Sequence, residues 1–241
     1  MSTTAAKILA HLETVESQRA RRAGEAGLNA RVAALKAYQQ QRFSHTYADL
    51  LQSSRYGAAS RFFLDELYGP GDFTRRDAQF ARVVPALVRL FPSEIVDTVA
   101  TLAELHALSE ALDTRMAQQL GTQRIAALDY VRAWQATGEA SRRQQQIALT
   151  LNVAMRLDGF TRKVLVRNSL RLMRGPARAA GLSELQRFLE AGFDTFRAMN
   201  GAQEFIALVD YREQALASSL FSASLSGTDD ASLQRAFAVL P

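Results

Sequence analysis

SEIVDTVATLAELHALSEALDTRMAQQL, residues 93–120, contains no glycine or proline, and it carries apolar side chains at intervals of three or four residues. Such spacing places apolar side chains on one face of a helix. The apolar residues near this face are Val99, Leu102, Leu105, Leu112 and Met116. The stretch therefore predicts a long amphipathic α-helix, which Gly121 ends.

The rest of the chain repeats this pattern. Its 241 residues include 13 glycines and 5 prolines, and 48% of them are hydrophobic. This is enough apolar surface for a packed core, and no alternating strand pattern competes. We therefore expect an all-α fold, with a single multi-helix domain of about ten helices that begins with an N-terminal helical hairpin. The expected parts are the hairpin at 1–43, the main helical domain at 44–222, and a flexible tail or short docked helix at 223–241.

Local signals set the expected helix boundaries. Thr74 with Asp77 has the spacing of a capping pair at a helix start. The pairs Asp158-Gly159 and Gly175-Pro176 have the composition of helix stops.

Composition and missing motifs restrict the function classes. Cysteine is absent, so there is no disulfide and no thiolate chemistry. No uncharged apolar run approaches the ~18 residues of a membrane span, and the charged amino terminus does not resemble a secretory signal, so we expect a cytoplasmic protein. Phosphate-binding glycine loops, GxSxG and HExxH are also missing. These features favour a binding or interaction protein over an enzyme.

Aromatic and charged residues are unusually dense in RYGAASRFFLDELYGPGDFTRRD, residues 55–77. One hypothesis is that some of them converge in a ligand pocket that shifts their pKa values. The alternative is that they cap helices, brace the GPG turn and pair with one another. The candidate ligand-binding residues are Arg55, Tyr56, Asp65, Glu66, Tyr68, Arg76 and Asp77.

Residues 62–68, Phe-Phe-Leu-Asp-Glu-Leu-Tyr, resemble the motif of a bacterial protein family named for FFLEELY, with aspartate in place of one glutamate. The resemblance is close over the motif, and it implies one compact helical domain. It implies no activity, cofactor or partner.

A second unusual segment is basic. Residues 139–178 contain nine basic and two acidic residues, a local charge of +7 in a chain whose net charge is +5. On a helix, Lys163, Arg167, Arg171 and Arg174 fall within one narrow sector. This stripe is a candidate site for nucleic-acid phosphates, an anionic membrane surface or a phosphorylated small molecule. The alternative is a solvated face, or one paired with acidic residues of neighbouring helices, such as Glu184, Glu190, Glu204, Asp210 and Glu213.

Two further hypotheses concern a cofactor and self-association. The sequence around His106, LAELHAL, is loosely similar to the globin pattern in which a proximal histidine binds haem iron. No other metal site is expected, and the cofactor is otherwise unknown. A homodimer is a further prediction, and the hairpin or the basic stripe is the expected binding surface of the protein.

Overall fold

The computed structural model describes residues 3–66, 73–121, 123–225, 230–237 and 239–241. In these residues there are 13 helices and no strand, which confirms the all-α prediction. The helices are α1 (Thr3–Gly24), α2 (Leu28–Thr46), α3 (Ala48–Gln52), α4 (Gly57–Glu66), α5 (Thr74–Leu90), α6 (Ser93–Gln119), α7 (Ala127–Thr137), α8 (Ala140–Thr161), α9 (Val164–Leu172), α10 (Arg174–Ala179), α11 (Ser183–Ala198), α12 (Gln203–Ser222) and α13 (Asp230–Phe237).

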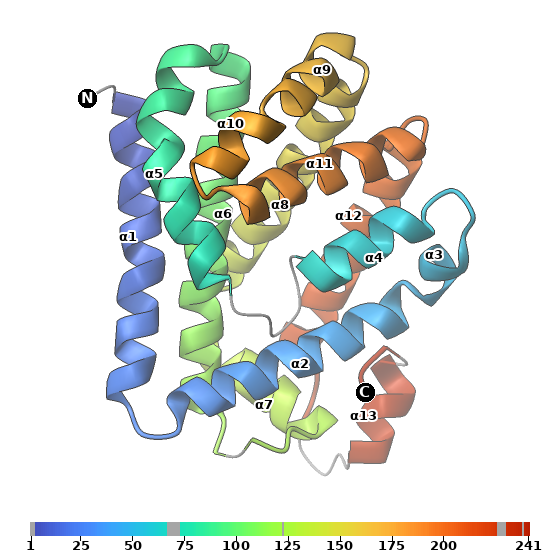
Figure 1. Ribbon diagram of the computed structural model, residues 1–241. Helices are drawn as coiled ribbons and strands as arrows, with labels where there is room; N and C mark the ends of the chain where they lie inside the picture. Colours follow the sequence, from blue (N-terminus) through green and yellow to red (C-terminus); the bar gives the residue numbers. More distant parts are fainter. Residues whose placement is uncertain (1–2, 67–72, 122, 226–229, 238) are drawn as a thin grey trace.

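Helix α6 is the central element of the fold. It contacts α1, α2, α5, α7 and α8 (Figure 1). Because neighbours surround it, α6 buries side chains on more than one face, including the polar residues Glu110, Asp113 and Thr114. The apolar pattern of the sequence predicts the length of this helix, but it does not predict this polar burial.

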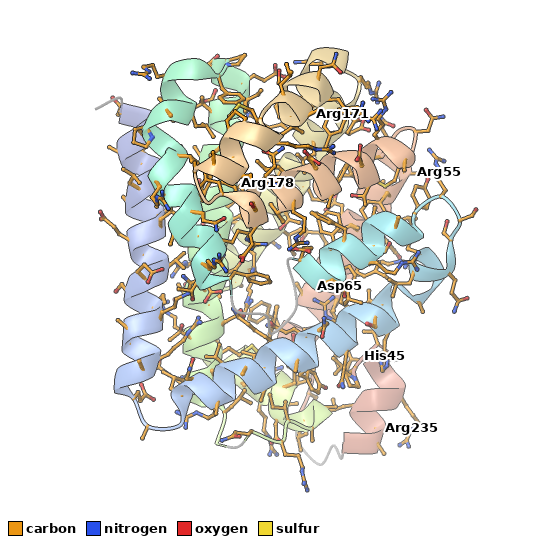
Figure 2. All side chains as sticks on the ribbon, viewed as in Figure 1. His45, Arg55, Asp65, Arg171, Arg178 and Arg235 are labelled. Atoms are coloured by element: carbon orange, nitrogen blue, oxygen red, sulfur yellow. The ribbon has the colours of Figure 1, made fainter. Side chains whose placement is uncertain are left out.

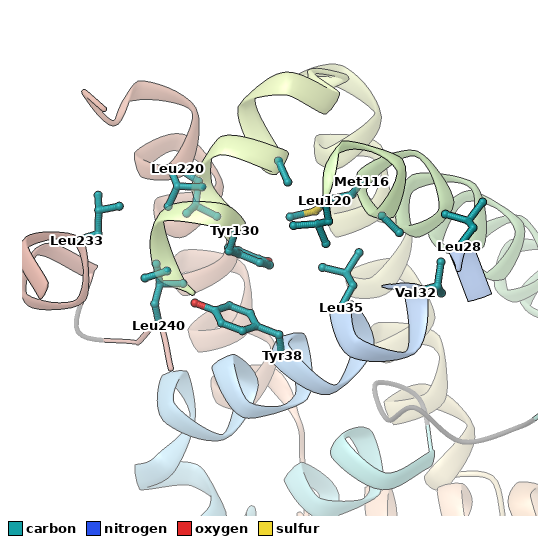
Figure 3. Close-up of a cluster of buried hydrophobic side chains, with 14 residues drawn as sticks. Leu28, Val32, Leu35, Tyr38, Met116, Leu120, Tyr130, Leu220, Leu233 and Leu240 are labelled. Atoms are coloured by element: carbon teal, nitrogen blue, oxygen red, sulfur yellow. The ribbon is translucent and has the colours of Figure 1, made fainter. Parts of the chain in front are cut away.

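The first two helices are joined through Gly27, whose φ of 72° favours glycine. Helix α1 packs chiefly along α6 and also contacts α5. Helix α2 contributes four residues to the largest core cluster, together with side chains of α6, α7 and α12 (Figure 3). In this cluster the rings of Tyr38 and Tyr130 stack at 4.7 Å between centroids. The members labelled in the figure are Leu28, Val32, Leu35, Tyr38, Met116, Leu120, Tyr130, Leu220, Leu233 and Leu240.

Three local boundary predictions are wrong. Asp158 and Gly159 lie inside α8, where the buried Asp158 carboxylate accepts hydrogen bonds from the Ala202 amide at 3.0 Å and from Gln203 at 3.1 Å. Gly175 and Pro176 lie in the first turn of α10, a position that tolerates proline because the amide needs no intrahelical partner there. The N-cap position of α5 is Phe73, which makes no side-chain cap, and Thr74, the expected cap residue, is the first residue of the helix.

Helix α9 lies at the upper edge of the molecule in Figure 1 and α10 lies below it, both away from α7 and α13. Helix α9 contacts α8, α10 and α11. Across the described helices, none is both long enough and apolar enough to cross a membrane.

Candidate functional site

Arg55 and Tyr56 join the start of α4 to the connection between α11 and α12. The Arg55 guanidinium donates to the carbonyl oxygens of Met199 at 2.8 Å and Gly201 at 3.0 Å, and it lies 2.9 Å from the Glu204 carboxylate. The Tyr56 hydroxyl donates to the same carboxylate at 2.5 Å. Every one of these contacts holds two segments together, so the arrangement is a structural brace.

Glu66 and Arg76 form a second group about the start of α5. The Arg76 guanidinium lies between the rings of Phe73 and Phe188, at 4.1 and 4.4 Å from their centroids. It also donates to the Glu66 carbonyl at 3.2 Å, and the Glu66 carboxylate accepts from Arg187 at 2.8 Å. Burial lowers the pKa of Arg76, but an arginine remains charged at neutral pH. This group therefore joins α4, α5 and α11 by cation–π and ionic contacts.

Asp77 forms a third group with residues far away in the sequence. Its Oδ2 atom lies 2.5 Å from an Arg19 nitrogen of α1 and 2.9 Å from His106 Nε2 of α6. Burial alone would raise the pKa of Asp77, but the hydrogen bonds and positive charges of His106 and Arg19 outweigh it and lower the pKa. Asp77 thus links α1, α5 and α6.

Of the remaining two candidates from residues 55–77, the structure describes only Asp65. Asp65 is exposed near the end of α4 (Figure 2), and Tyr68 lies outside the described residues. The cavity beside Phe63 and Phe205 has a volume of about 20 Å³ and is lined mostly by apolar side chains, which is room for about one water molecule. Five of the described candidates thus belong to three separate groups, and none of the described candidates lines that cavity.

The sequence-predicted candidates do not include a cluster of buried charges that is centred on Glu110 of α6. Glu110 of α6 lies 2.5 Å from Arg22 of α1 and 2.5 Å from Lys36 of α2. The exposed side-chain fractions are 6% for Glu110, 5% for Arg22 and 17% for Lys36. Burial alone would raise the pKa of Glu110, but the charges of Lys36 and Arg22 outweigh it and lower the pKa from 4.5 to about 2.

Asp113 lies one turn further along α6, and its pKa is raised where that of Glu110 is lowered. Its carboxylate accepts a hydrogen bond from Gln39 at 3.2 Å. Burial raises its pKa, and the nearby positive charges of Lys36 and Arg143 reduce this rise without cancelling it. The signal that could have located this cluster is the spacing of His106, Glu110 and Asp113, which puts them on one helix face. A pair of carboxylates with opposed pKa shifts occurs in catalytic sites and in structural ion clusters alike.

Replacing Asp113 by asparagine should raise the free energy of unfolding at neutral pH. The folded-state pKa of Asp113 lies above its unfolded value, so the ionised group costs stability at high pH, and this cost disappears as pH falls through the folded pKa. Asparagine removes the charge and keeps an acceptor for Gln39. Urea unfolding at several pH values measures the effect; an unchanged or lower stability in Asp113→Asn at pH 7 would show that the carboxylate is well compensated.

The basic stripe runs from Lys163, just before α9, through Arg167 and Arg171 of α9 to Arg174 of α10. Three of its four members form ion pairs. Lys163 lies 2.6 Å from Glu94, Arg167 lies 3.4 Å from Asp194, and Arg174 makes a bidentate contact of 2.6 and 2.7 Å with Glu190. These pairs are partly or largely exposed, with side-chain exposure of 49%, 33% and 59% for the three cations. Exposed pairs of this kind contribute little stability, typically below about 1 kcal/mol.

Arg171 is the fourth member of the stripe, and among the described residues its side chain has no hydrogen-bond or ion-pair partner. It is exposed, and both it and Arg178 lie in the upper half of the molecule in Figure 2. An open groove of about 380 Å³ lies between α10 and α11 and is lined by Arg174, Arg178 and Arg187 together with Glu190 and Asp194. We call Arg171, Arg174, Arg178, Arg187 and this groove the basic surface.

The side chain of His106 contacts α5. Its Nε2 atom is already within hydrogen-bond distance of Asp77, and its side chain lines neither the small cavity nor the groove. In the part of the chain that is described, no group of three or more histidine, aspartate or glutamate side chains could hold a metal ion.

Comparison with known proteins identifies a family to which the chain is similar. No curated protein and no solved structure matches the chain. A family model described as a domain of unknown function, DUF8198, matches residues 18–226. The match covers most of the chain, from the last part of α1 to just beyond the end of α12. The protein therefore belongs to the DUF8198 family.

Proposed function

We propose that the protein is a binding protein whose basic surface engages a phosphate-rich anionic partner. The observation that carries the proposal is Arg171, an exposed guanidinium that makes no hydrogen bond or ion pair with a side chain among the described residues, together with three further arginines on α10 and α11. The segment from Gly159 to Ser183 contains six basic residues and no acidic one. Basicity concentrated in one segment is the electrostatic feature expected of a polyanion-binding surface.

The ion pairs of the stripe are compatible with this role. Arg174 and Lys163 are themselves exposed where they meet their carboxylates, and pairs in high-dielectric surroundings exchange readily for other anions. A phosphate, like a carboxylate, presents two oxygens that can accept a bidentate pair of hydrogen bonds from the planar guanidinium of arginine. Glu190 and Asp194 in the groove limit affinity for a single small anion, so an extended partner that also reaches Arg171 and Arg178 fits the surface better.

The double substitution Arg171→Gln/Arg178→Gln should weaken binding of inorganic polyphosphate roughly tenfold and reduce the dependence of log K on log salt by about 1 for each arginine removed. Fluorescence anisotropy with labelled polyphosphate over a salt series measures both quantities. Both side chains are exposed and make no hydrogen bond or ion pair with another side chain among the described residues, so the unfolding midpoint should stay nearly unchanged.

The matched control is Arg132→Gln/Arg235→Gln. It removes the same charge from exposed arginines of α7 and α13, and Arg235 lies at the opposite end of the molecule from Arg171 (Figure 2). This control should bind polyphosphate nearly as tightly as the unchanged protein. Equal losses in the two double variants would mean that net charge alone causes binding, and salt-insensitive or undetectable binding by the unchanged protein would overturn the proposal.

A further inference from the structure

We infer that the anionic partner is the surface of a lipid bilayer, which the α9–α10 segment enters with Leu172 and Met173; this inference rests on the proposed function. Leu172 is 79% exposed, and Met173 is 45% exposed. Among the described residues, no large hydrophobic side chain is more exposed than Leu172, and both residues lie between Arg171 and Arg174. Adjacent large apolar side chains that are exposed to solvent, and that are flanked by arginines, are typical of a surface that binds a partner.

The position of the segment suits this partner. Helix α9 lies at the edge of the molecule (Figure 1), and its main contacts are with α8, α10 and α11. Among its described side chains, none is buried. A short amphipathic helix in this position can lie in the plane of a membrane interface, with its apolar side chains among the acyl chains and its cations at the headgroups.

The arginines of the basic surface are also suited to an anionic bilayer. Arg171, Arg174 and Arg178 have long side chains that can reach headgroup phosphates while their carbon stems cover apolar surface. The groove behind α10 brings Arg187 of α11 to the same surface. Basic residues near an anionic leaflet strengthen adsorption, each by a factor of about 5.

A nucleic acid fits the same surface less well. Protein surfaces that bind single strands stack bases on aromatic side chains, and residues 161–187 contain no phenylalanine, tyrosine or tryptophan. The residues that stand out from the basic surface are aliphatic, and these gain free energy from acyl chains rather than from bases or phosphates. The apolar component therefore favours a bilayer.

The test is co-sedimentation with vesicles made of phosphatidylglycerol and phosphatidylcholine in equal parts, compared with vesicles of phosphatidylcholine alone. The unchanged protein should bind the anionic vesicles only. Leu172→Ser/Met173→Ser should weaken this binding roughly tenfold and leave polyphosphate binding unchanged, because no charge is altered. Tyr211→Ser, which removes an aromatic ring that is 75% exposed on α12, is the matched control and should bind vesicles normally.

Insertion can also be measured directly. The chain has a single tryptophan, Trp134 of α7, and Leu172→Trp adds a second at the proposed contact. The emission of the added tryptophan should shift to the blue with anionic vesicles and should be quenched by lipids brominated on the acyl chains.

The outcomes separate the two proposals. Polyphosphate binding without vesicle binding would overturn the membrane inference and leave the anionic surface intact, and stronger binding of single-stranded RNA than of vesicles would do the same. Vesicle binding that Leu172→Ser/Met173→Ser does not change would also overturn the inference, as would emission of the Leu172→Trp variant that brominated lipids do not quench. Failure to bind polyphosphate, RNA and vesicles alike would overturn both proposals.

Discussion

Replacing Glu110 by glutamine should lower the free energy of unfolding by about 3 to 5 kcal/mol at neutral pH, because a buried cation that loses its partner destabilises a protein by this amount. The Glu110 carboxylate neutralises Arg22 and Lys36 in the interior between α1, α2 and α6. Glutamine keeps the size of the side chain but removes its charge. Urea or guanidinium denaturation followed by circular dichroism measures the change.

The pH dependence gives an independent measurement. The pKa of Glu110 falls from 4.5 to about 2 on folding, so its contribution is fully present above pH 4.5 and is lost as pH falls through about 2. The difference between the two pKa values corresponds to about 3 kcal/mol. Stability of the unchanged protein should therefore decrease between these pH values, and Glu110→Gln should show a shallower decrease. Asp113→Asn is the comparison variant, because it should raise the free energy of unfolding at neutral pH where Glu110→Gln should lower it.

A triple substitution distinguishes an ion cluster from a single indispensable carboxylate. Arg22→Met/Lys36→Met/Glu110→Leu removes all three charges together and should recover most of the stability that Glu110→Gln loses, because an apolar set no longer contains an uncompensated charge. If Glu110→Gln has the stability of the unchanged protein, water must already solvate Arg22 and Lys36. Their exposed fractions of 5% and 17% oppose that result.

The ion cluster shows which features of this fold a sequence can and cannot predict. Apolar periodicity predicts α6 nearly to the residue, because a helix pattern is local. Glu110 meets Arg22 and Lys36 only because α1 and α2 both pack against α6, and these partners are separated from Glu110 by more than seventy positions. Asp77 illustrates the same limit. Its spacing from Thr74 indicates a local cap, whereas Arg19 and His106 bind its side chain.

The basic stripe is predictable only in part for the same reason. The spacing of Lys163, Arg167 and Arg174 follows from the helix period, but the carboxylates that they contact belong to α6 and α11. The exposed position of Leu172 cannot be derived from the sequence either. Periodicity says which side chains share a face, but only the placement of α9 at the edge of the molecule leaves Leu172 open to solvent.

The motif at residues 62–68 has a structural explanation in the residues that are described. Phe62 stacks on Phe188 with centroids 5.5 Å apart, and a Cβ atom at Gly192 would lie 3.1 Å from its ring. Phe63 contacts the rings of Phe196 and Phe205, each at 5.8 Å between centroids. The two adjacent phenylalanines thus fix α4 against α11 and α12, and glycine at 192 permits the close approach.

Replacing Phe196 by alanine should consequently lower the free energy of unfolding by about 3 to 5 kcal/mol. Phe196 is 0% exposed and belongs to the core cluster that includes Phe43, Tyr47 and Phe205. Alanine leaves a cavity beside Phe63 that the surrounding helices can only partly close. Phe196→Leu keeps much of the volume and should cost less than about 1.5 kcal/mol. Denaturant unfolding of the two variants measures this graded loss.

Polyphosphate binding by the same variants separates packing from function. Phe196 and the motif lie in the interior between α4, α11 and α12, whereas the basic surface is formed by arginines of α9, α10 and α11 that are exposed. Below the unfolding transition, Phe196→Leu should bind polyphosphate as the unchanged protein does. Weakened binding together with full stability in that variant would contradict a packing role, and would require that the phenylalanines of the motif control the position of α11 under the arginines.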